Sequence, residues 1–153
     1  MLRTWLTILL ISFCALLSAQ NYRIGDVYTA PDGSKGVVYY LFPDGSGGWV
    51  VALNDASTNC SWGDRHDDVP LLANQNTSLN IQFLKDTAGY AHTQILRNYQ
   101  NNSNFAAGVV DFEHGWVLPS PAQLNMLFAQ LPFISSAITA AGGTVPFATD
   151  NAF

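Results

Sequence analysis

The stretch Gly115-Trp-Val-Leu-Pro-Ser-Pro-Ala-Gln-Leu-Asn-Met-Leu-Phe128 carries the clearest local structure signal in the chain. Its apolar run, residues 116–118, is typical of a short buried strand. Ser120 then stands where a helix N-cap belongs, with Pro121 at the first helical position and Gln123 at the place of a capping-box partner. Apolar residues follow at helical spacing and form one stripe, which consists of Leu124, Leu127, Phe128 and Leu131. We therefore predict a strand that leads directly into a capped helix.

Two similar turn sequences lie near the start of the chain. Pro31-Asp-Gly-Ser34 recurs as Pro43-Asp-Gly-Ser46. In such a sequence Pro fixes φ, Asp bonds to its own backbone and Gly adopts the left-handed conformation, so both are predicted tight turns. The flanks are rich in Val, Tyr and Trp, which predicts an antiparallel three-stranded meander with strands at 26–29, 37–42 and 49–53.

The second half of the chain favours helices. Helical patterns cover residues 87–100, 105–112 and 121–131, and Pro132 is expected to begin a separate helix over 133–141, stopped by Gly142-Gly143. On the helix at 87–100, the expected apolar face consists of Ala88, Ala91, Ile95, Leu96 and Tyr99. Residues 54–72 are expected to form an irregular polar loop, and 79–84 a weak strand. The fold class is therefore α+β, with a meander and three or four helices.

The N-terminus has the pattern of an export signal. Arg3 provides the positive charge, residues 5–17 are apolar, and Ser18-Ala19 offer small residues for cleavage before Gln20 or Asn21. The apolar run is shorter than the roughly 20 residues of a membrane-spanning helix, which disfavours an anchor. We expect residues 1–19 to be a cleaved signal peptide, residues 22–153 to form one domain, and the mature protein to be secreted or displayed at the cell surface, with no membrane span.

Charge and cysteine content narrow the function further. The net charge is −5 and no basic run exists, so nucleic-acid binding is not expected. Cys14 lies within the signal, which leaves Cys60 without a disulfide partner in the mature chain. Because free cysteine is usually buried, we expect Cys60 to be buried.

The segment around Trp116 resembles the Gly-Trp-x-Leu-Pro-Ser-x-x-Glu-Leu-x-x-Leu signature of bacterial C-type-lectin-like exported domains, known as the Lcl C-terminal domain or major paralogous domain. Weaker similarities lie at residues 48–53, 61–63, 92–95 and 105–107. The resemblance implies a lectin-like fold that binds ligands or mediates adhesion, without catalytic residues. The family continues with further strands beyond the point that corresponds to Phe153, so the chain is expected to be incomplete. The positions that carry the signature are Trp116, Leu118, Pro119, Ser120, Gln123 and Leu124.

The polar loop at 54–72 contains the candidate ligand-binding residues. Trp62 lies among polar residues, which favours an exposed aromatic side chain. Close behind it, carboxylates and an imidazole could supply calcium ligands, but their spacing lacks the alternation of a calcium loop, so no cofactor is expected. The candidates are Trp62, Asp64, His66, Asp67 and Asp68.

Other chemical groups favour structural roles. The aromatic residues Tyr39, Tyr40, Trp49, Tyr90 and Trp116 could form a platform for sugar rings together with Trp62, but core packing explains most of them, Trp116 above all. Asp111, Glu113 and His114 are expected to form a polar turn rather than an acid–base pair, because neighbouring residues rarely point at one reaction centre. His92 has no second His at the spacing of a zinc helix, so we expect it to be structural and partly exposed.

The sequence thus predicts an exported, non-enzymatic module that binds carbohydrate or another protein. One alternative is a structural segment of a longer cell-envelope protein. Another is an enzyme of the formylglycine-generating type, for which Cys60 alone is a poor candidate.

Overall fold

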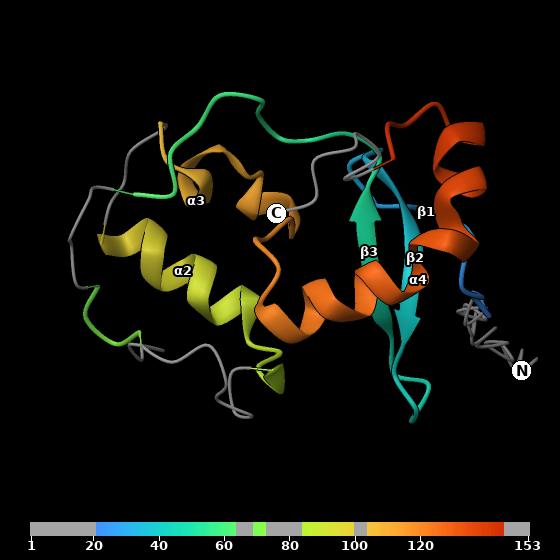
Figure 1. Ribbon diagram of the computed structural model, residues 1–153, viewed down its shortest axis with the longest axis horizontal. Coiled ribbons are helices and arrows are strands. Elements are labelled where there is room, and N and C mark those ends of the chain that lie inside the picture. Colours follow the sequence, from blue (N-terminus) through green and yellow to red (C-terminus); the bar gives the residue numbers. More distant parts are fainter. Residues whose placement is uncertain (1–20, 64–68, 73–83, 100–103, 146–153) are drawn as a thin grey trace, which may run out of the picture.

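The computed structural model describes residues 21–63, 69–72, 84–99 and 104–145. Within these ranges the chain is a mixed α+β domain, as the sequence predicted (Figure 1). In chain order its elements are β1 (Val27–Thr29), β2 (Lys35–Leu41), β3 (Gly48–Ala52), α2 (Gly89–Tyr99), α3 (Ala106–Val109), the 3-10 turn η1 (Phe112–His114) and α4 (Pro121–Ala140).

The predicted meander is confirmed. The strands form one antiparallel sheet in the order β1-β2-β3, with Val37 opposite both Val27 and Val51. In both Pro-Asp-Gly turns the glycine adopts the left-handed conformation, with φ values of 87° at Gly33 and 72° at Gly45. In each turn the Asp carboxylate accepts hydrogen bonds from the backbone N–H and the hydroxyl of the Ser two residues later.

Helix α4 is continuous, which corrects the prediction of two helices separated at Pro132. It runs from Pro121 through Pro132 to Ala140, and Figure 1 shows it change direction between its orange and red parts. Proline usually breaks a helix because it removes a hydrogen bond and crowds the preceding turn. Here Ile134 and Ile138, which lie beyond the proline, are completely buried. Their burial explains why the helix continues across Pro132 toward the sheet.

The core lies between β2 and α4. Val37 and Tyr39 point from one face of β2 toward the apolar stripe of the helix, since alternate strand residues share a face. Burial raises the pKa of the Tyr39 hydroxyl to about 12. The predicted stripe is confirmed for Leu124, Leu127 and Leu131, and it extends to Ile134 and Ile138.

The predicted strand at 116–118 does not form, because the segment pairs with no strand among the described residues. Its polar groups bond to side chains and turns instead. The Trp116 N–H donates to the Asp111 carbonyl, and the Leu118 N–H donates to the Thr93 hydroxyl. An apolar triplet alone could not distinguish a paired strand from an extended connection.

The helix predicted at 87–100 is confirmed as α2, but its buried face differs from the expected one. Gly89 and Thr93 are buried, whereas Ala88 and Ala91 are exposed. The helix predicted at 105–112 is interrupted: α3 ends at Val109, Val110 is extended with φ −72° and ψ 141°, and η1 follows. The buried face of α2 differs because Gly89 and Thr93 lie directly against the segment that leads into α4.

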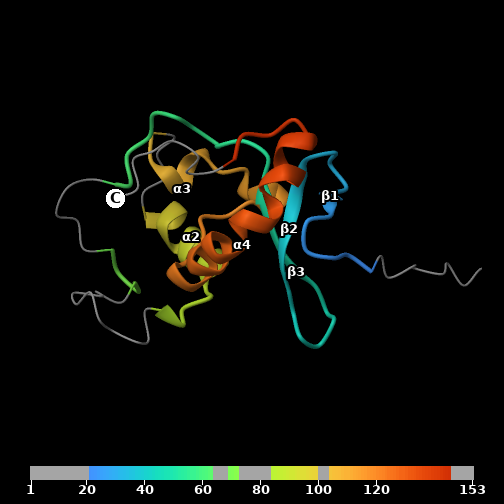
Figure 2. The same cartoon turned by 45° about the vertical axis from the view of Figure 1, so that its right-hand side comes forward.

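A tight joint connects α2 to the start of α4. Thr93 donates its hydroxyl proton to the Gly89 carbonyl at 2.7 Å and accepts the Leu118 N–H at 3.0 Å. The Asp86 carbonyl accepts the Ala122 N–H and the Ser120 hydroxyl. The N-terminal end of α4 is therefore fixed to α2, while its C-terminal half packs on the sheet, as both views show (Figures 1 and 2).

Among the described residues, no helix is both long and apolar enough to cross a membrane. The predicted signal peptide lies outside the described residues, as do most of the weak strand at 79–84 and the last eight residues.

Candidate functional site

Trp62 is exposed, as predicted, with 79% of its surface accessible. The backbone beside it is fixed. Ser61 donates its N–H to the Asn104 carbonyl at 3.0 Å and accepts the Ala106 N–H at 2.7 Å, forming a short parallel bridge to Phe105. The indole is therefore held in solvent by a backbone that is attached to the start of α3.

The four polar candidates that follow, Asp64, His66, Asp67 and Asp68, lie outside the described residues. Their relation to Trp62 and the calcium hypothesis therefore remain predictions.

The aromatic residues considered for a common platform are divided between the core and the surface. Tyr39 is buried, and Trp49 packs between Tyr39, Tyr40 and Phe42, with ring centroids 4.7 Å apart in its stacked pair with Tyr40. Trp62 and Tyr90 are exposed, and they lie on different segments. Core packing thus explains the β2–β3 aromatics, while Trp62 and Tyr90 are available to a ligand.

The signature segment has a structural role. Ser120 has the extended conformation of an N-cap, and the Gln123 side chain accepts its N–H at 2.9 Å, which is the Gln half of the predicted capping box. Both residues are buried. Leu124 packs against the core and Leu118 is half-buried, whereas Pro119 is exposed. Trp116, predicted to be in the core, is only half-buried, and its indole N–H donates to the Ser34 hydroxyl.

Three exposed side chains meet beside Trp116. Asp32 comes from the β1–β2 turn, and Asp111 and His114 come from the two ends of η1. Nδ1 of His114 lies 2.8 Å from Asp111 and 3.7 Å from Asp32. The hydrogen bond that the His114 Nδ1–H donates to Asp111, together with the charge of that carboxylate, raises the pKa of His114, and hydrogen bonds from Ser34 lower the pKa of Asp32.

This cluster offers two carboxylate oxygens and an imidazole nitrogen within 4.8 Å of one another. Atoms of these types could coordinate a divalent cation. Nδ1 of His114, however, is already paired with Asp111, and all three side chains are exposed. The geometry is that of a polar turn, as predicted for Asp111, Glu113 and His114, and it connects η1 to the β1–β2 turn.

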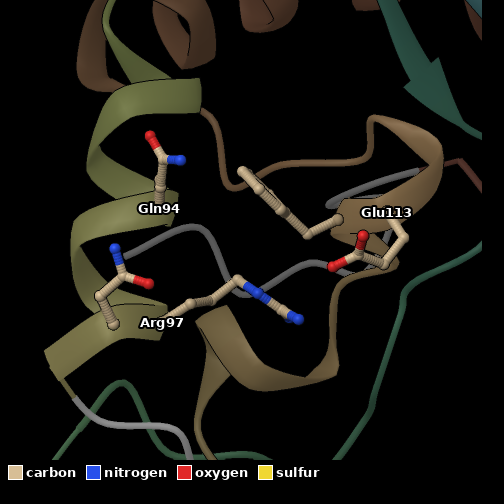
Figure 3. Close-up of a pocket in the computed structure, with 5 residues that line it drawn as sticks. Gln94, Arg97 and Glu113 are labelled. Carbon is tan, nitrogen blue, oxygen red and sulfur yellow. The ribbon is translucent and has the colours of Figure 1, made fainter.

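A pocket of about 300 Å³ opens between α2 and η1 (Figure 3). Its lining comes from one face of α2 and from two consecutive residues of η1: Gln94, Arg97, Asn98, Phe112 and Glu113. In Figure 3 the Arg97 guanidinium extends from α2 toward η1, and the Glu113 carboxylate points back toward α2. The two charged groups form no ion pair within the part of the chain that the structure describes.

The guanidinium of Arg97 is firmly held. Nη1 donates to the carbonyls of Ala107 and Val110 at 3.1 and 3.3 Å, and the group lies over the Phe112 ring, 5.4 Å from its centroid. Tyr90, one turn before Gln94 on α2, stacks on Phe112 with a centroid distance of 4.9 Å. Arg97 thus connects α2 to α3 and fixes one wall of the pocket.

Four of the five lining residues were not among the sequence candidates. Gln94, Arg97 and Asn98 do share a helix face by their spacing, which is a signal in the sequence. A polar face on a helix usually indicates solvent exposure alone, however, and only the fold brings η1 opposite it.

Cys60 is exposed, which contradicts the expected burial. It lies in the irregular segment between β3 and Trp62, in which most of the described residues are exposed. His92 is partly exposed, as predicted, and its Nδ1 lies 3.4 Å from the Asp86 carboxylate at the α2–α4 joint.

Comparison of the chain with models of known protein families, with curated proteins and with solved structures finds no match.

Proposed function

We propose that this chain is an exported, non-enzymatic binding or adhesion module of C-type-lectin-like fold, which meets carbohydrate or protein partners outside the cell. The single observation that carries the proposal is the exposed indole of Trp62 on a backbone fixed to α3.

An exposed tryptophan on a fixed backbone suits a binding surface. Tryptophan is enriched among the residues that dominate binding energy, because it buries a large area and loses few rotamers. The bridge between Ser61 and the start of α3 means that little backbone order has to be gained when a partner binds. The net charge of −5 favours partners other than nucleic acids.

One contact supports the lectin-like fold within this proposal. Two stretches of the family resemblance, 92–95 and 115–127, are joined in the structure by the hydrogen bond from the Leu118 N–H to Thr93. A mixed α+β architecture with an antiparallel sheet is consistent with it. The sheet contains three strands in the described residues, so the finer fold assignment rests on the resemblance.

The proposal is tested with the purified exported protein on glycan and extracellular-matrix protein arrays. Trp62→Ala is expected to weaken binding of any captured partner about tenfold or more, the effect of losing a major contact residue. Phe133→Ala is the matched control, because Phe133 is a similarly exposed aromatic, at 73%, on α4. Equal loss in both variants, or no partner on either array, would count against the proposal.

A further inference from the structure

The pocket between α2 and η1 has a balanced set of polar groups. Arg97 can only donate hydrogen bonds, Glu113 as a carboxylate can only accept them, and the amides of Gln94 and Asn98 do both. The opposite charges of Arg97 and Glu113 face the same space without being paired to each other. A ligand that completes this set must donate and accept hydrogen bonds at neighbouring positions.

We infer that this pocket binds a neutral polyhydroxyl ligand the size of one sugar ring, an inference that rests on the proposed binding function and gives it a ligand class. Each hydroxyl can donate to Glu113 and accept from Arg97 or an amide. A ligand carboxylate would be attracted by Arg97 but repelled by Glu113, and a ligand ammonium group would meet the reverse. Neutral hydroxyls avoid both repulsions.

Size and apolar surface agree with this class. A volume of about 300 Å³ is at the lower end of small-molecule sites and suits one hexose. Tyr90 is 56% exposed and stacks on Phe112 beside the pocket, so its ring offers an apolar surface for sugar C–H groups. Tyr90, Gln94 and Arg97 lie on one face of α2, which places the aromatic ring and the polar groups side by side.

The guanidinium is also ordered before any ligand binds. Its Nη1 bonds to two carbonyls and the group rests on Phe112, while Nε and Nη2 form no hydrogen bond to another described residue. A ligand therefore gains donors whose ordering is already complete, which lowers the entropic cost of binding.

The test is an NMR titration of the full mature chain with sugars of one ring that differ in charge. Glucose and N-acetylglucosamine are the neutral probes, glucuronate carries a carboxylate and glucosamine carries an ammonium group. At least one neutral probe is expected to shift the amide signals of residues 94–98 and 112–113, with a Kd of about 0.1–10 mM for a ligand of this size. Glucuronate and glucosamine are expected to bind about tenfold more weakly.

Glu113→Gln provides the sharper comparison, because it keeps the shape of the side chain and removes its charge. It is expected to weaken binding of the neutral probe about tenfold. Because the charge that repels a carboxylate is gone, the affinity for glucuronate should rise relative to that for the neutral probe. Asp55→Asn removes another exposed carboxylate, which lies outside the pocket, and should change neither affinity. Tighter binding of either charged sugar to the unmodified protein, or shifts confined to other residues, would overturn the inference.

Trp62→Ala separates this inference from the proposed function. It should leave the sugar titration unchanged while it weakens array binding. Array binding that depends on Trp62, with no neutral probe in the pocket, would overturn the pocket inference alone. Sugar binding at 94–98, together with array binding that Trp62→Ala leaves unchanged, would instead overturn the role of Trp62 in the proposed function and leave the pocket inference standing.

Discussion

Gly89 shows how a single residue sets the distance between two helices. It begins α2 directly against the cap of α4, where an added Cβ would overlap Gln123 Oε1 and lie 2.6 Å from the Leu118 carbonyl oxygen. In an ordinary helix, alanine is more stable than glycine by about 0.5–1 kcal/mol. Here the overlap should reverse that sign, and Gly89→Ala is expected to lower the free energy of unfolding by about 1–3 kcal/mol.

Urea denaturation measures this change, and Gly47→Ala is its control. A Cβ at Gly47 meets only the Phe42 ring at 3.6 Å, an ordinary contact, so its effect should stay within about 0.5 kcal/mol. A stability of Gly89→Ala equal to or above that of the unmodified protein would contradict the close packing of α2 on the α4 cap.

His114 gives a prediction about pH. Its pKa is raised above 6.5, first by the hydrogen bond to Asp111 and then by the charge of that carboxylate. Because the folded-state pKa is raised, the ion pair contributes its full stability below about pH 6.5 and loses it as the pH rises through the raised pKa. The imidazole C–H signal in NMR should therefore titrate above 6.5 and move back toward that value in Asp111→Asn.

Asp32 and Glu113 supply the comparison for this titration. Both act on His114 only through their charge and more weakly than Asp111, so Asp32→Asn and Glu113→Gln should each shift the midpoint less than Asp111→Asn. An equal shift in all three variants would show that the net charge of the turn, rather than the bond to Asp111, sets the pKa.

Sequence reasoning succeeded at residues whose role is local. The Gln123 side chain accepts the N–H of the N-cap residue Ser120, which lies only three positions before it. Trp62 is exposed in a segment whose sequence is rich in polar residues. It failed at Cys60, where an average tendency toward burial was overridden by an irregular segment. It also missed Thr93, which is completely buried although polar, because its hydroxyl is satisfied by groups 4 and 25 residues away.

Helix α4 carries the main prediction for the secondary-structure elements. Its second half is held on the sheet by Ile134 and Ile138, both completely buried. If this packing keeps the helix continuous across Pro132, Ile138→Ala should cost about 2–5 kcal/mol of unfolding free energy, the range for truncation of a buried isoleucine. Phe133→Ala, at an exposed position of the same half, should cost less than about 0.5 kcal/mol. Similar small losses in both variants would mean that this half contributes little to the fold.

The elements that the sequence predicted well are those with their own start and stop signals. The meander follows from the two Pro-Asp-Gly turns, and α4 begins at its capping residues. The strand at 116–118 was wrong because a strand requires a partner, and no local pattern reveals whether one exists. The break at Pro132 was wrong because the burial of Ile134 and Ile138 outweighs the local effect of proline. The pocket depends on the packing of α2, α3 and η1 against one another. No local sequence pattern predicts this packing.

At the scale of the whole molecule, α4 connects a sheet to a group of short helices. The sheet and the C-terminal half of α4 form the apolar core, and the start of α4 is joined to α2, which carries one wall of the pocket. Figure 2 shows α2 and α3 on one side of α4 and the sheet on the other. The core thus lies apart from the two candidate binding surfaces. This separation allows substitutions at Trp62 or Glu113, both exposed, to test binding with little effect on stability.

The last prediction concerns export of the whole chain. The positive Arg3 and the apolar residues 5–17 predict cleavage before Gln20 or Asn21. Tyr22 lies just after the predicted cleavage site and packs on Tyr28, with ring centroids 5.6 Å apart. A chain cleaved before Gln20 or Asn21 therefore retains every described helix and strand. In a bacterial host, mass spectrometry of the exported protein should show a chain that lacks residues 1–19 or 1–20. Arg3→Glu should reduce export, because it reverses the charge of the signal, whereas Arg23→Glu, an exposed position beyond the cleavage site, should not. A chain that retains Met1 in the cell, or equal export of both variants, would refute the signal-peptide assignment and remove the basis for an extracellular role.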